Sequence, residues 1–165
     1  MSVNRTLEQA GLRPTLSRIL VIEFFHEHAD QHLYVEDVYR GLNGDAQQLS
    51  LATVHRAMSQ LVNAGLLSCV ALGDGRTIYE LNKGQPHDHL VCTACSRIAE
   101  FFDTVIESRQ QAIAGDLSFA ISERHLVLFG LCADCQNRQL QTRRSDPKVA
   151  LPLTVRPKRN RLSRA

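Results

Sequence analysis

The stretch Glu80-Leu-Asn-Lys-Gly-Gln-Pro-His87-Asp-His89-Leu-Val-Cys92-Thr-Ala-Cys95 concentrates metal-binding side chains far beyond what ordinary packing requires. It holds two histidines, two cysteines and two carboxylates. Cys92 and Cys95 have the C-x2-C spacing of a metal knuckle, and Cys132 and Cys135 repeat it. Four thiolates from two knuckles form a closed tetrahedral site, the usual form of structural zinc. Because residues 96–131 separate the knuckles, the sequence predicts a small structured segment clamped at both ends.

The histidines and the glutamate of the same stretch predict a second site of different chemistry. His87 and His89 are two residues apart, so on an extended segment both side chains leave the same face. Glu80 lies a short way upstream, on the other side of Gly84 and Pro86. A mixed nitrogen and oxygen set suits Fe2+, Mn2+, Co2+ or Zn2+ rather than a closed thiolate site. We therefore expect two metals, one that holds the fold and one that exchanges.

Length and composition restrict the class of protein. A chain of 165 residues fits one domain or two small ones. It has no apolar run long enough to span a membrane, and its N-terminus lacks the pattern of a signal peptide. We expect a cytoplasmic protein without a membrane partner, whose cysteines are reduced and free to bind metal. Cys69 lies in an apolar run and is expected to be a small core residue.

The formal net charge of +2 hides an asymmetry. Residues 141–165 contain eight lysines and arginines against one aspartate, whereas residues 1–140 hold more acidic than basic side chains. We expect residues 141–165 to form a basic, disordered tail. Such a tail either adds sequence-independent attraction to nucleic acid or is a solvated appendage with no specific role.

The first 82 residues show helical patterns followed by two short alternating runs. Helices are expected over residues 5–11, 15–27, 35–42 and 50–63, and strands over 67–72 and 77–81, joined by a glycine-rich turn at 73–76. This order predicts a winged helix-turn-helix. In the helix capped by Ser50, one face is apolar and the other is small, hydroxylic and basic. The second face suits base edges and phosphates in a major groove.

Beyond residue 82 the pattern changes to a small α/β unit. We expect a strand near 97–102, a helix near 104–114 and a strand near 125–130. A unit this small buries little core, so a zinc clamp and a dimer partner would both stabilise it. The predicted fold is α+β. An N-terminal winged helix-turn-helix domain (1–82) and a hinge (83–86) precede a small α/β dimerisation domain with a four-cysteine zinc site (87–140), and the tail (141–165) follows.

Seven motifs occur in order over roughly residues 5–136. They are Gly11-Leu-Arg-Pro-Thr-Leu-Ser-Arg18, Ala52-Thr-Val-His-Arg56, Ala64-Gly-Leu, Glu80-Leu, His87-Asp-His-Leu-Val-Cys-Thr-Ala-Cys95, Glu100-Phe and Gly130-Leu-Cys-Ala-Asp-Cys135. Together they resemble the ferric uptake regulator family of bacterial metal-dependent repressors. The resemblance implies a protein that forms a homodimer. It also implies that the protein is not an enzyme and has no small-molecule substrate. In such a protein metal occupancy sets the angle between the domains, and the metal-loaded form binds double-stranded operator DNA.

The resemblance also implies site residues. The regulatory metal site would consist of His32, Glu80, His87, His89 and Glu100, and the four-cysteine site would hold structural Zn2+. The candidate DNA contacts, from the resemblance and from the polar helix face, are Arg13, Arg18, Ser50, Ala52, Thr53, His55 and Arg56.

This chain departs from the family pattern at two places. His55 stands where the family usually has tyrosine on the recognition helix. Asp88 and Glu107 match the acids of a further metal site that some members carry, but Pro86 and Arg124 stand where its histidines would be. We therefore expect that further site to be absent.

Fe2+ is the expected regulatory ion. Zinc sensors of the family typically place a cysteine in the regulatory set, and its peroxide sensors have aspartates where this chain has Glu80 and Glu100. Ligand type does not separate Mn2+ from Fe2+, so manganese-, zinc- and peroxide-responsive regulators stay as alternatives. Outside the family, a zinc deaminase would need H-x-E with a downstream P-C-x-x-C, and neither occurs. A thiol redox protein and a structural zinc module without DNA binding are the remaining alternatives.

Overall fold

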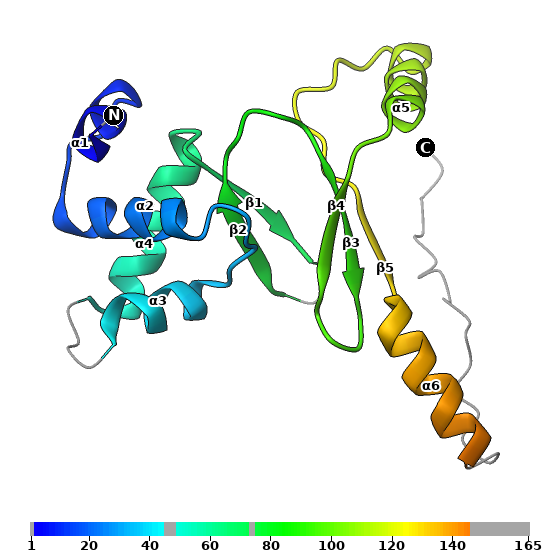
Figure 1. The fold of residues 1–165 in the computed structure, drawn as a ribbon. Coiled ribbons are helices and arrows are strands. Elements are labelled where there is room, and N and C mark those ends of the chain that lie inside the picture. The colour runs from blue at the N-terminus through cyan, green and yellow to red at the C-terminus, as the bar shows by residue number, and fades with distance from the viewer. Residues whose placement is uncertain (1, 45–48, 73–74, 146–165) are drawn as a thin grey trace. The chain divides into compact units, whose positions relative to one another are not determined.

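The structure, a computed structural model, describes residues 2–44, 49–72 and 75–145 (Figure 1). The predicted turn at 73–76 lies partly outside these residues, and the predicted basic tail mostly so. The chain divides into two compact units, Met1–Leu90 with Ile98–Leu128, and Val91–Arg97 with Phe129–Ala165. The predicted hinge at 83–86 falls inside the first unit, so the hinge stays a prediction. In the described ranges, no helix has both the length and the apolar character needed to span a membrane.

Four helices begin the first unit, close to the ranges that the sequence predicts. They are α1 (Val3–Gln9), α2 (Leu16–Glu27), α3 (Val35–Asn43) and α4 (Leu51–Asn63). Their apolar faces meet in one core that includes Leu7, Phe25 and Met58, all fully buried. Burial of this apolar surface, and not local propensity, supplies most of the stability of such short helices.

Helix α4 follows directly from its sequence. Val54, Met58 and Leu61 recur at helical spacing and are fully buried. Ser50 caps the helix, because its Oγ accepts the backbone N–H of Thr53 at 3.2 Å. The cap fixes where the helix begins, and the buried stripe fixes which face remains exposed.

The hairpin that follows consists of β1 (Leu67–Ala71) and β2 (Thr77–Leu81). The strands are antiparallel, with Leu67 opposite Leu81 and Val70 opposite Ile78. A single bridge joins β2 to the segment before α3, because Leu33 and Tyr79 exchange backbone hydrogen bonds of 2.9 and 2.8 Å. Helices and hairpin together form the predicted winged helix-turn-helix.

A three-stranded sheet forms after the hairpin. Its strands β3 (Asp88–Cys92), β4 (Ile98–Phe101) and β5 (Val127–Gly130) lie in the order β4-β3-β5, and α5 (Thr104–Asp116) connects β4 towards β5 (Figure 1). The Asp103 side chain caps α5 by accepting the N–H groups of Val105 and Ile106 at 2.7 and 3.1 Å. Strand β5 begins two residues later than expected, which is within the usual uncertainty of element ends.

Helix α6 (Ala133–Ser145) differs from the sequence-based expectation. The sequence predicts that periodicity ends near Asn137 and that a disordered tail begins at residue 141, but the helix continues to Ser145. Its residues are almost all polar, so no apolar stripe marks it. The many glutamines and arginines nevertheless have good intrinsic helix propensity, which explains why the helix forms.

Asn43 fixes the approach to α4. Its amide nitrogen donates to the carbonyl oxygens of Tyr39 and Leu49 at 3.0 Å, and its Oδ1 accepts the N–H of Leu49 at 2.9 Å. The side chain is buried, at 8% exposure. It thereby ties the end of α3 to the residue just before the Ser50 cap.

We expect Asn43→Ala to lower the free energy of unfolding by about 2–3 kcal/mol, because the polar groups of Leu49 lose their partners inside the protein. Asn63→Ala is the matched control. Asn63 is exposed at the end of α4, so its replacement should change stability by less than about 0.5 kcal/mol. Urea unfolding followed by far-ultraviolet circular dichroism measures both, and equal effects would contradict the role of Asn43.

Candidate metal centres

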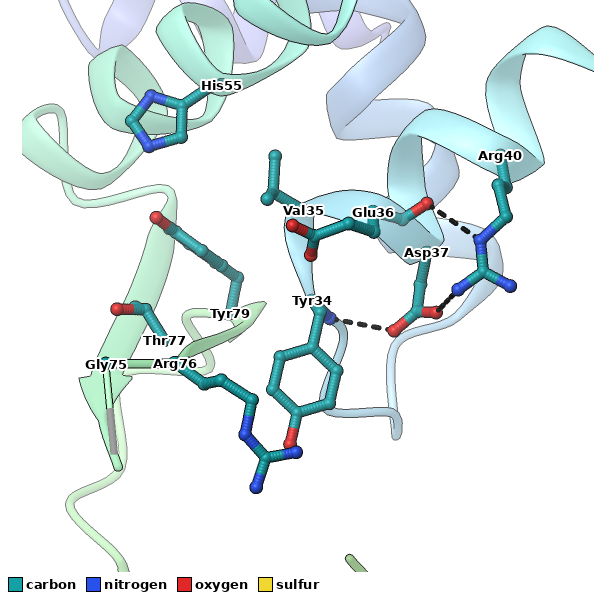
Figure 2. Close-up of a pocket in the computed structure, with 10 residues that line it drawn as sticks. All are labelled: Tyr34, Val35, Glu36, Asp37, Arg40, His55, Gly75, Arg76, Thr77 and Tyr79. Carbon is teal, nitrogen blue, oxygen red and sulfur yellow. Dashed lines mark hydrogen bonds and ion pairs between the residues drawn. The ribbon is translucent and has the colours of Figure 1, made fainter. Parts of the chain in front are cut away.

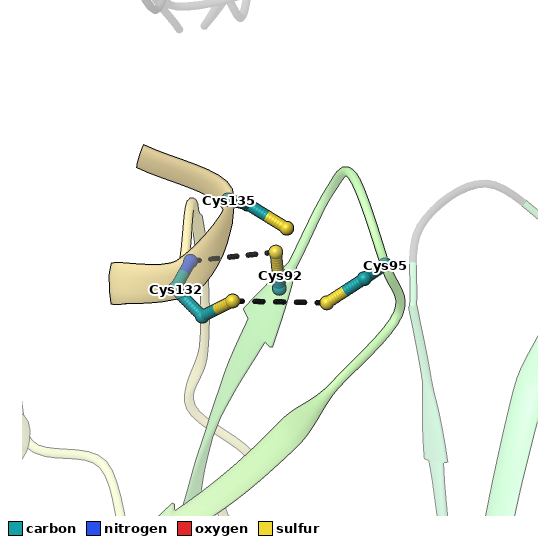
Figure 3. A group of neighbouring side chains, drawn as sticks. All are labelled: Cys92, Cys95, Cys132 and Cys135. Atoms are coloured by element: carbon teal, nitrogen blue, oxygen red, sulfur yellow. Dashed lines mark hydrogen bonds between the residues drawn. The ribbon is translucent and has the colours of Figure 1, made fainter. Parts of the chain in front are cut away.

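The four knuckle cysteines come together in the second unit (Figure 3). Cys92 ends β3, Cys95 lies on the following turn, Cys132 precedes α6 and Cys135 lies in its first turn. Their sulfur atoms all lie within 4.8 Å of one another, and the four side chains point towards a common centre. The structure therefore brings together all four predicted zinc ligands.

Backbone hydrogen bonds form the first knuckle. The Cys92 N–H donates to the Arg97 carbonyl at 2.8 Å, and the Ser96 N–H donates to the Cys92 carbonyl at 2.9 Å. Ser96 takes a positive φ of 59° to complete the turn. The Thr93 N–H donates to the Gly130 carbonyl at 2.8 Å, which holds this knuckle beside the end of β5. The tight turn directs Cys92 and Cys95 towards the second pair.

The sulfur geometry fits a tetrahedral metal rather than a disulfide. The Sγ atoms of Cys95 and Cys132 are 3.7 Å apart, and all four cysteines are free. Zn–S bonds of about 2.3 Å place the sulfurs of a tetrahedral site about 3.8 Å apart, whereas disulfide sulfurs are about 2 Å apart. The backbone N–H of Cys132, 3.3 Å from the sulfur, lowers the pKa of Cys92 to about 6. This favours the thiolate, the form that binds metal.

A second cluster lies in the first unit and joins four separate segments. His32 lies between α2 and α3, and Glu80 lies on β2. His87 directly precedes β3, His89 is the second residue of β3, and Glu100 lies on β4. The Nε2 atom of His32 lies 3.0 Å from Glu80 Oε2 and 3.0 Å from His89 Nε2. The Nε2 atom of His87 lies 3.0 Å from Glu80 Oε1. Each of the three imidazoles thus directs its Nε2 atom at the Glu80 carboxylate.

Glu100 lies at the edge of this cluster. Its Oε1 is 3.4 Å from the Nε2 of His32, and its side chain is 42% exposed, against 10% for Glu80. The structure therefore brings all five predicted regulatory residues to one place, with Glu100 on the side that faces solvent.

Local contacts orient the ligands. His87 Nδ1 lies 3.1 Å from the Gln85 carbonyl oxygen, so a proton on Nδ1 donates there and leaves Nε2 with a free lone pair. The backbone bridge between Leu33 and Tyr79 sets the residues next to them, His32 and Glu80, side by side. The backbone pairing thus fixes the relative position of two of the predicted metal ligands.

The electrostatics of the cluster depend on Glu80, which is buried at 8% exposure. Burial alone would raise its pKa, but hydrogen bonds with His32 and His89 and the charge of His87 hold the pKa well below its usual range. Burial lowers the pKa of His87, but its hydrogen bond to the Gln85 carbonyl and its proximity to Glu80 leave that pKa raised overall. A buried anion among imidazoles favours a bound cation, either a proton or a metal.

The donor set fits an exchangeable divalent metal. Bonds of about 2.1 Å to nitrogen and oxygen place neighbouring donor atoms about 3.0–3.4 Å apart, close to the separations of 3.0–3.8 Å around Glu80 and the histidines. Imidazole and carboxylate donors suit Fe2+, Mn2+ or Zn2+. No cysteine of the described residues belongs to this cluster.

Two residues named for the further metal site, Asp88 and Arg124, form an ion pair. Asp88 is fully buried, and its Oδ2 lies 3.7 Å from Nη1 of Arg124, which also donates to Gln110 Oε1 at 3.0 Å. His125 pairs with Glu123 at 2.9 Å. The family resemblance places Asp88 and Arg124 at the same site, but it does not predict the ion pair between them.

The candidate DNA contacts lie mostly on the outer face of α4 and beside it. Ser50, Ala52, His55 and Arg56 are on this side of the molecule, where Ala52, His55 and Arg56 are exposed. Arg18 in α2 is held against α4, because its Nε donates to Gln60 Oε1 at 2.9 Å and its Nη1 donates to the Arg13 carbonyl. The basic groups named from the sequence thus lie next to the helix expected to read DNA.

A hollow of about 390 Å³ adjoins this face (Figure 2). His55 of α4 and Tyr79 of the hairpin face it from one side, and Glu36 from the start of α3 faces it from another. Arg76 lies over the ring of Tyr34, 5.3 Å from its centre. Glu36 and Asp37 add negative charge beside α4, which sequence reasoning about the basic face did not foresee.

The fold agrees with comparisons to known proteins. A sequence profile described as the Ferric uptake regulator family matches residues 9–129. The chain belongs to the ferric uptake regulator family. The Ferric uptake regulation protein of Cupriavidus metallidurans is 46% identical over 134 residues, which cover 80% of this chain and 94% of that protein.

Solved structures of ferric uptake regulators share the fold. That of Francisella tularensis with iron has a TM-score of 0.71 at 30% identity, over 76% of this chain and 96% of that one. That of Pseudomonas aeruginosa with manganese has a TM-score of 0.67 at 33% identity, over 81% and 99%. As a member of the ferric uptake regulator family, this protein is a metal-dependent transcriptional regulator, a regulatory rather than an enzymatic class.

We expect Cys92→Ser to remove bound zinc, because a closed four-thiolate site does not tolerate the loss of one ligand. Zinc content should fall from about one ion per chain to near zero, and the unfolding temperature should fall. Cys69→Ser is the control, since Cys69 lies on β1 outside the cluster. Elemental analysis of the purified variants measures the outcome, and normal zinc in Cys92→Ser would contradict the assignment.

Affinity at the histidine cluster should fall in mild acid. Every histidine must be neutral to bind metal, and the raised pKa of His87 lets protons compete up to a higher pH than an ordinary imidazole would allow. We expect Mn2+ affinity to fall about tenfold or more from about pH 7.5 to about pH 6. Calorimetric titration of zinc-replete protein with Mn2+ tests this, and an affinity independent of pH would contradict it.

Proposed function

We propose that this protein is an iron-responsive repressor in which Fe2+, bound by His32, Glu80, His87, His89 and Glu100, switches on binding to double-stranded operator DNA. One observation supports the proposal: donor atoms of four side chains from three separate segments lie within 4.8 Å of one another, and Glu100 from a fourth segment lies 3.4 Å from His32. A purely structural role would not require so many titratable groups around one buried glutamate. In this proposal Zn2+ at Cys92, Cys95, Cys132 and Cys135 is structural.

The switch depends on which segments supply the ligands. His32 and Glu80 precede the proposed hinge at 83–86, and the other three ligands follow it. Only one arrangement of the two sides of the hinge brings all five ligands together. An ion that binds this arrangement more tightly than others shifts the population towards it, by the difference in its affinities. Metal occupancy and DNA affinity are then linked reciprocally.

The nitrogen and oxygen donor set supports Fe2+ as the effector, with Mn2+ the second candidate. Glutamates at positions 80 and 100, and a described cluster made of histidine and glutamate without cysteine, favour these ions over zinc or a peroxide response. The relatives solved with iron and with manganese, both at least 30% identical to this chain, agree with this choice.

The outer face of α4 is the proposed DNA-reading surface. Arg56 and His55 are exposed on it, and Ser50 and Thr53 lie at its N-terminal end, the end that enters a major groove in helix-turn-helix proteins. The hairpin residue Arg76 and the buttressed Arg18 lie on neighbouring elements and can contact phosphates.

A homodimer is the proposed assembly. In the first unit, large apolar side chains are exposed on β3, just after β4, on α5, on the segment after α5 and on β5, with Val105 at 75% and Phe119 at 74%. Isolated monomers seldom expose so much apolar surface. A second copy of the chain would cover these residues, which are Leu90, Phe102, Val105, Ile113, Leu117, Phe119, Ile121 and Leu128.

We expect His89→Ala to abolish metal-dependent DNA binding, because it removes a ligand that is 3% exposed at the centre of the cluster. Duplexes selected from a random library by the wild-type protein with Mn2+ provide the probe, titrated anaerobically with Fe2+, Mn2+ and Zn2+. Activation by Fe2+ or Mn2+ at micromolar concentration, lost in the variant, is the expected result.

His125→Ala is the matched control for this experiment. His125 is an exposed histidine that pairs with Glu123 outside the cluster, so its loss should leave activation unchanged. Zinc content and circular dichroism of both variants establish that they are folded. DNA affinity in His89→Ala that still responds normally to metal would refute the switch.

A further inference from the structure

Arg138 contacts the cluster of four cysteines directly. It lies three residues after Cys135 in α6, a spacing that puts both side chains on one face of the helix. Its Nη2 donates to the Cys135 Sγ at 2.8 Å. The family resemblance did not mark this residue, and no apolar pattern draws attention to it.

The charge of the cluster explains what such a contact does. Four thiolates around one Zn2+ carry a net charge of −2, and Cys92 and Cys135 are only 4% and 5% exposed. Buried charge needs hydrogen-bond donors or an opposite charge nearby. The Cys132 N–H supplies one donor, to Cys92. Cys135 receives its donor from a side chain rather than from the backbone.

Arg138 is the cation best placed to compensate this charge. The other nearby arginine, Arg97, lies 3.6 Å from the carboxylate of Asp134, so its charge is already balanced. Among the ion pairs of the described residues, none joins Arg138 to a carboxylate, and the sulfur is the acceptor of its hydrogen bond.

We propose that Arg138 is a positioning residue of the zinc site, which holds the Cys135 sulfur as a weakly nucleophilic, hydrogen-bonded thiolate and so protects the bound zinc from electrophiles. The proposal rests on zinc being held by the four cysteines. A charge-assisted hydrogen bond draws electron density from the sulfur lone pair that an electrophile would attack. Loss of the bond should leave the fold in place and raise the reactivity of one particular cysteine.

Alkylation by iodoacetamide tests that reactivity. The thiolate sulfur forms a bond to the methylene carbon, the carbon–iodine bond breaks, and iodide leaves with the electron pair. An alkylated cysteine is a much poorer ligand, so zinc is released and a chromogenic chelator reports it. Mass spectrometry of the quenched reaction identifies which cysteine reacts first.

Three variants of the full-length, zinc-loaded protein separate charge from geometry. Arg138→Gln removes the charge, Arg138→Lys keeps it without the planar fork, and Arg109→Gln removes an exposed arginine of α5 in the other unit. We expect zinc release about tenfold faster in Arg138→Gln, with Cys135 alkylated earlier than in the wild type. Arg138→Lys should be intermediate, and Arg109→Gln should match the wild type.

A spectroscopic readout distinguishes hydrogen bonding to sulfur from general loosening. With Co2+ in place of zinc, the thiolate-to-metal charge-transfer band should move to lower energy in Arg138→Gln and partly return in Arg138→Lys. An Arg138→Gln variant with wild-type release kinetics and an unchanged band would overturn the proposal. If the purified wild-type protein contained no zinc, the assignment of the four cysteines as zinc ligands would be refuted instead. Failure of the Arg138 proposal and failure of the zinc assignment are therefore distinguishable.

Discussion

The histidine cluster depends on one buried carboxylate, that of Glu80, which three imidazole nitrogens approach at 3.0–3.8 Å. Nε2 atoms of His32 and His89 only 3.0 Å apart repel each other if both present lone pairs. A proton or a metal ion must therefore lie between the donors, and the two compete for the same place. In the proposed function, this competition is what makes the cluster responsive to metal. The surrounding segments are held in register by the backbone bridge between Leu33 and Tyr79, which fixes His32 beside Glu80.

In the function proposed above, the two clusters separate permanent from exchangeable metal binding. The cysteine cluster has four ligands from two tight turns, its own backbone donors and the Arg138 hydrogen bond, all inside one compact unit. A closed set of thiolates has no position left for exchange. The histidine cluster draws on segments far apart in the chain and has Glu100 open to solvent. Nitrogen and oxygen donors bind more weakly than four thiolates do, and ligands contributed by separate segments give way when the segments move apart.

The electrostatic setting of α4, the proposed DNA-reading helix, depends on its neighbours as well as on its own residues. His55 and Arg56 are exposed on the helix, and Arg18 is held by Gln60, so positive charge and hydrogen-bond donors line one side. Glu36 and Asp37 border the hollow on the other side. Arg40 and Arg76 line the same hollow, and Asp37 pairs with Arg40 at 2.7 Å, so acidic and basic side chains offset one another there. Both acids lie in the first turn of α3, where negative charge also stabilises the helix N-terminus.

The sequence by itself determined the N-terminal helices and the hairpin, because apolar residues at regular spacing mark the buried face of each element. Val54, Met58 and Leu61 do so in α4. The sequence also predicted the group of four cysteines that the structure brings together, because C-x2-C spacing is a local property of a tight turn. For the histidine cluster it located His87, His89 and Glu80 directly, and the family resemblance supplied His32 and Glu100. It missed α6, whose residues are nearly all polar and carry no apolar stripe. Only the tertiary structure decided the pairing of Asp88 with Arg124 and the contact of Arg138 with Cys135. Such contacts depend on where the turns and strands bring side chains together in space. Polar residues that are distant in the chain, or that lie on a helix without an apolar stripe, leave no sequence pattern from which their contact can be predicted.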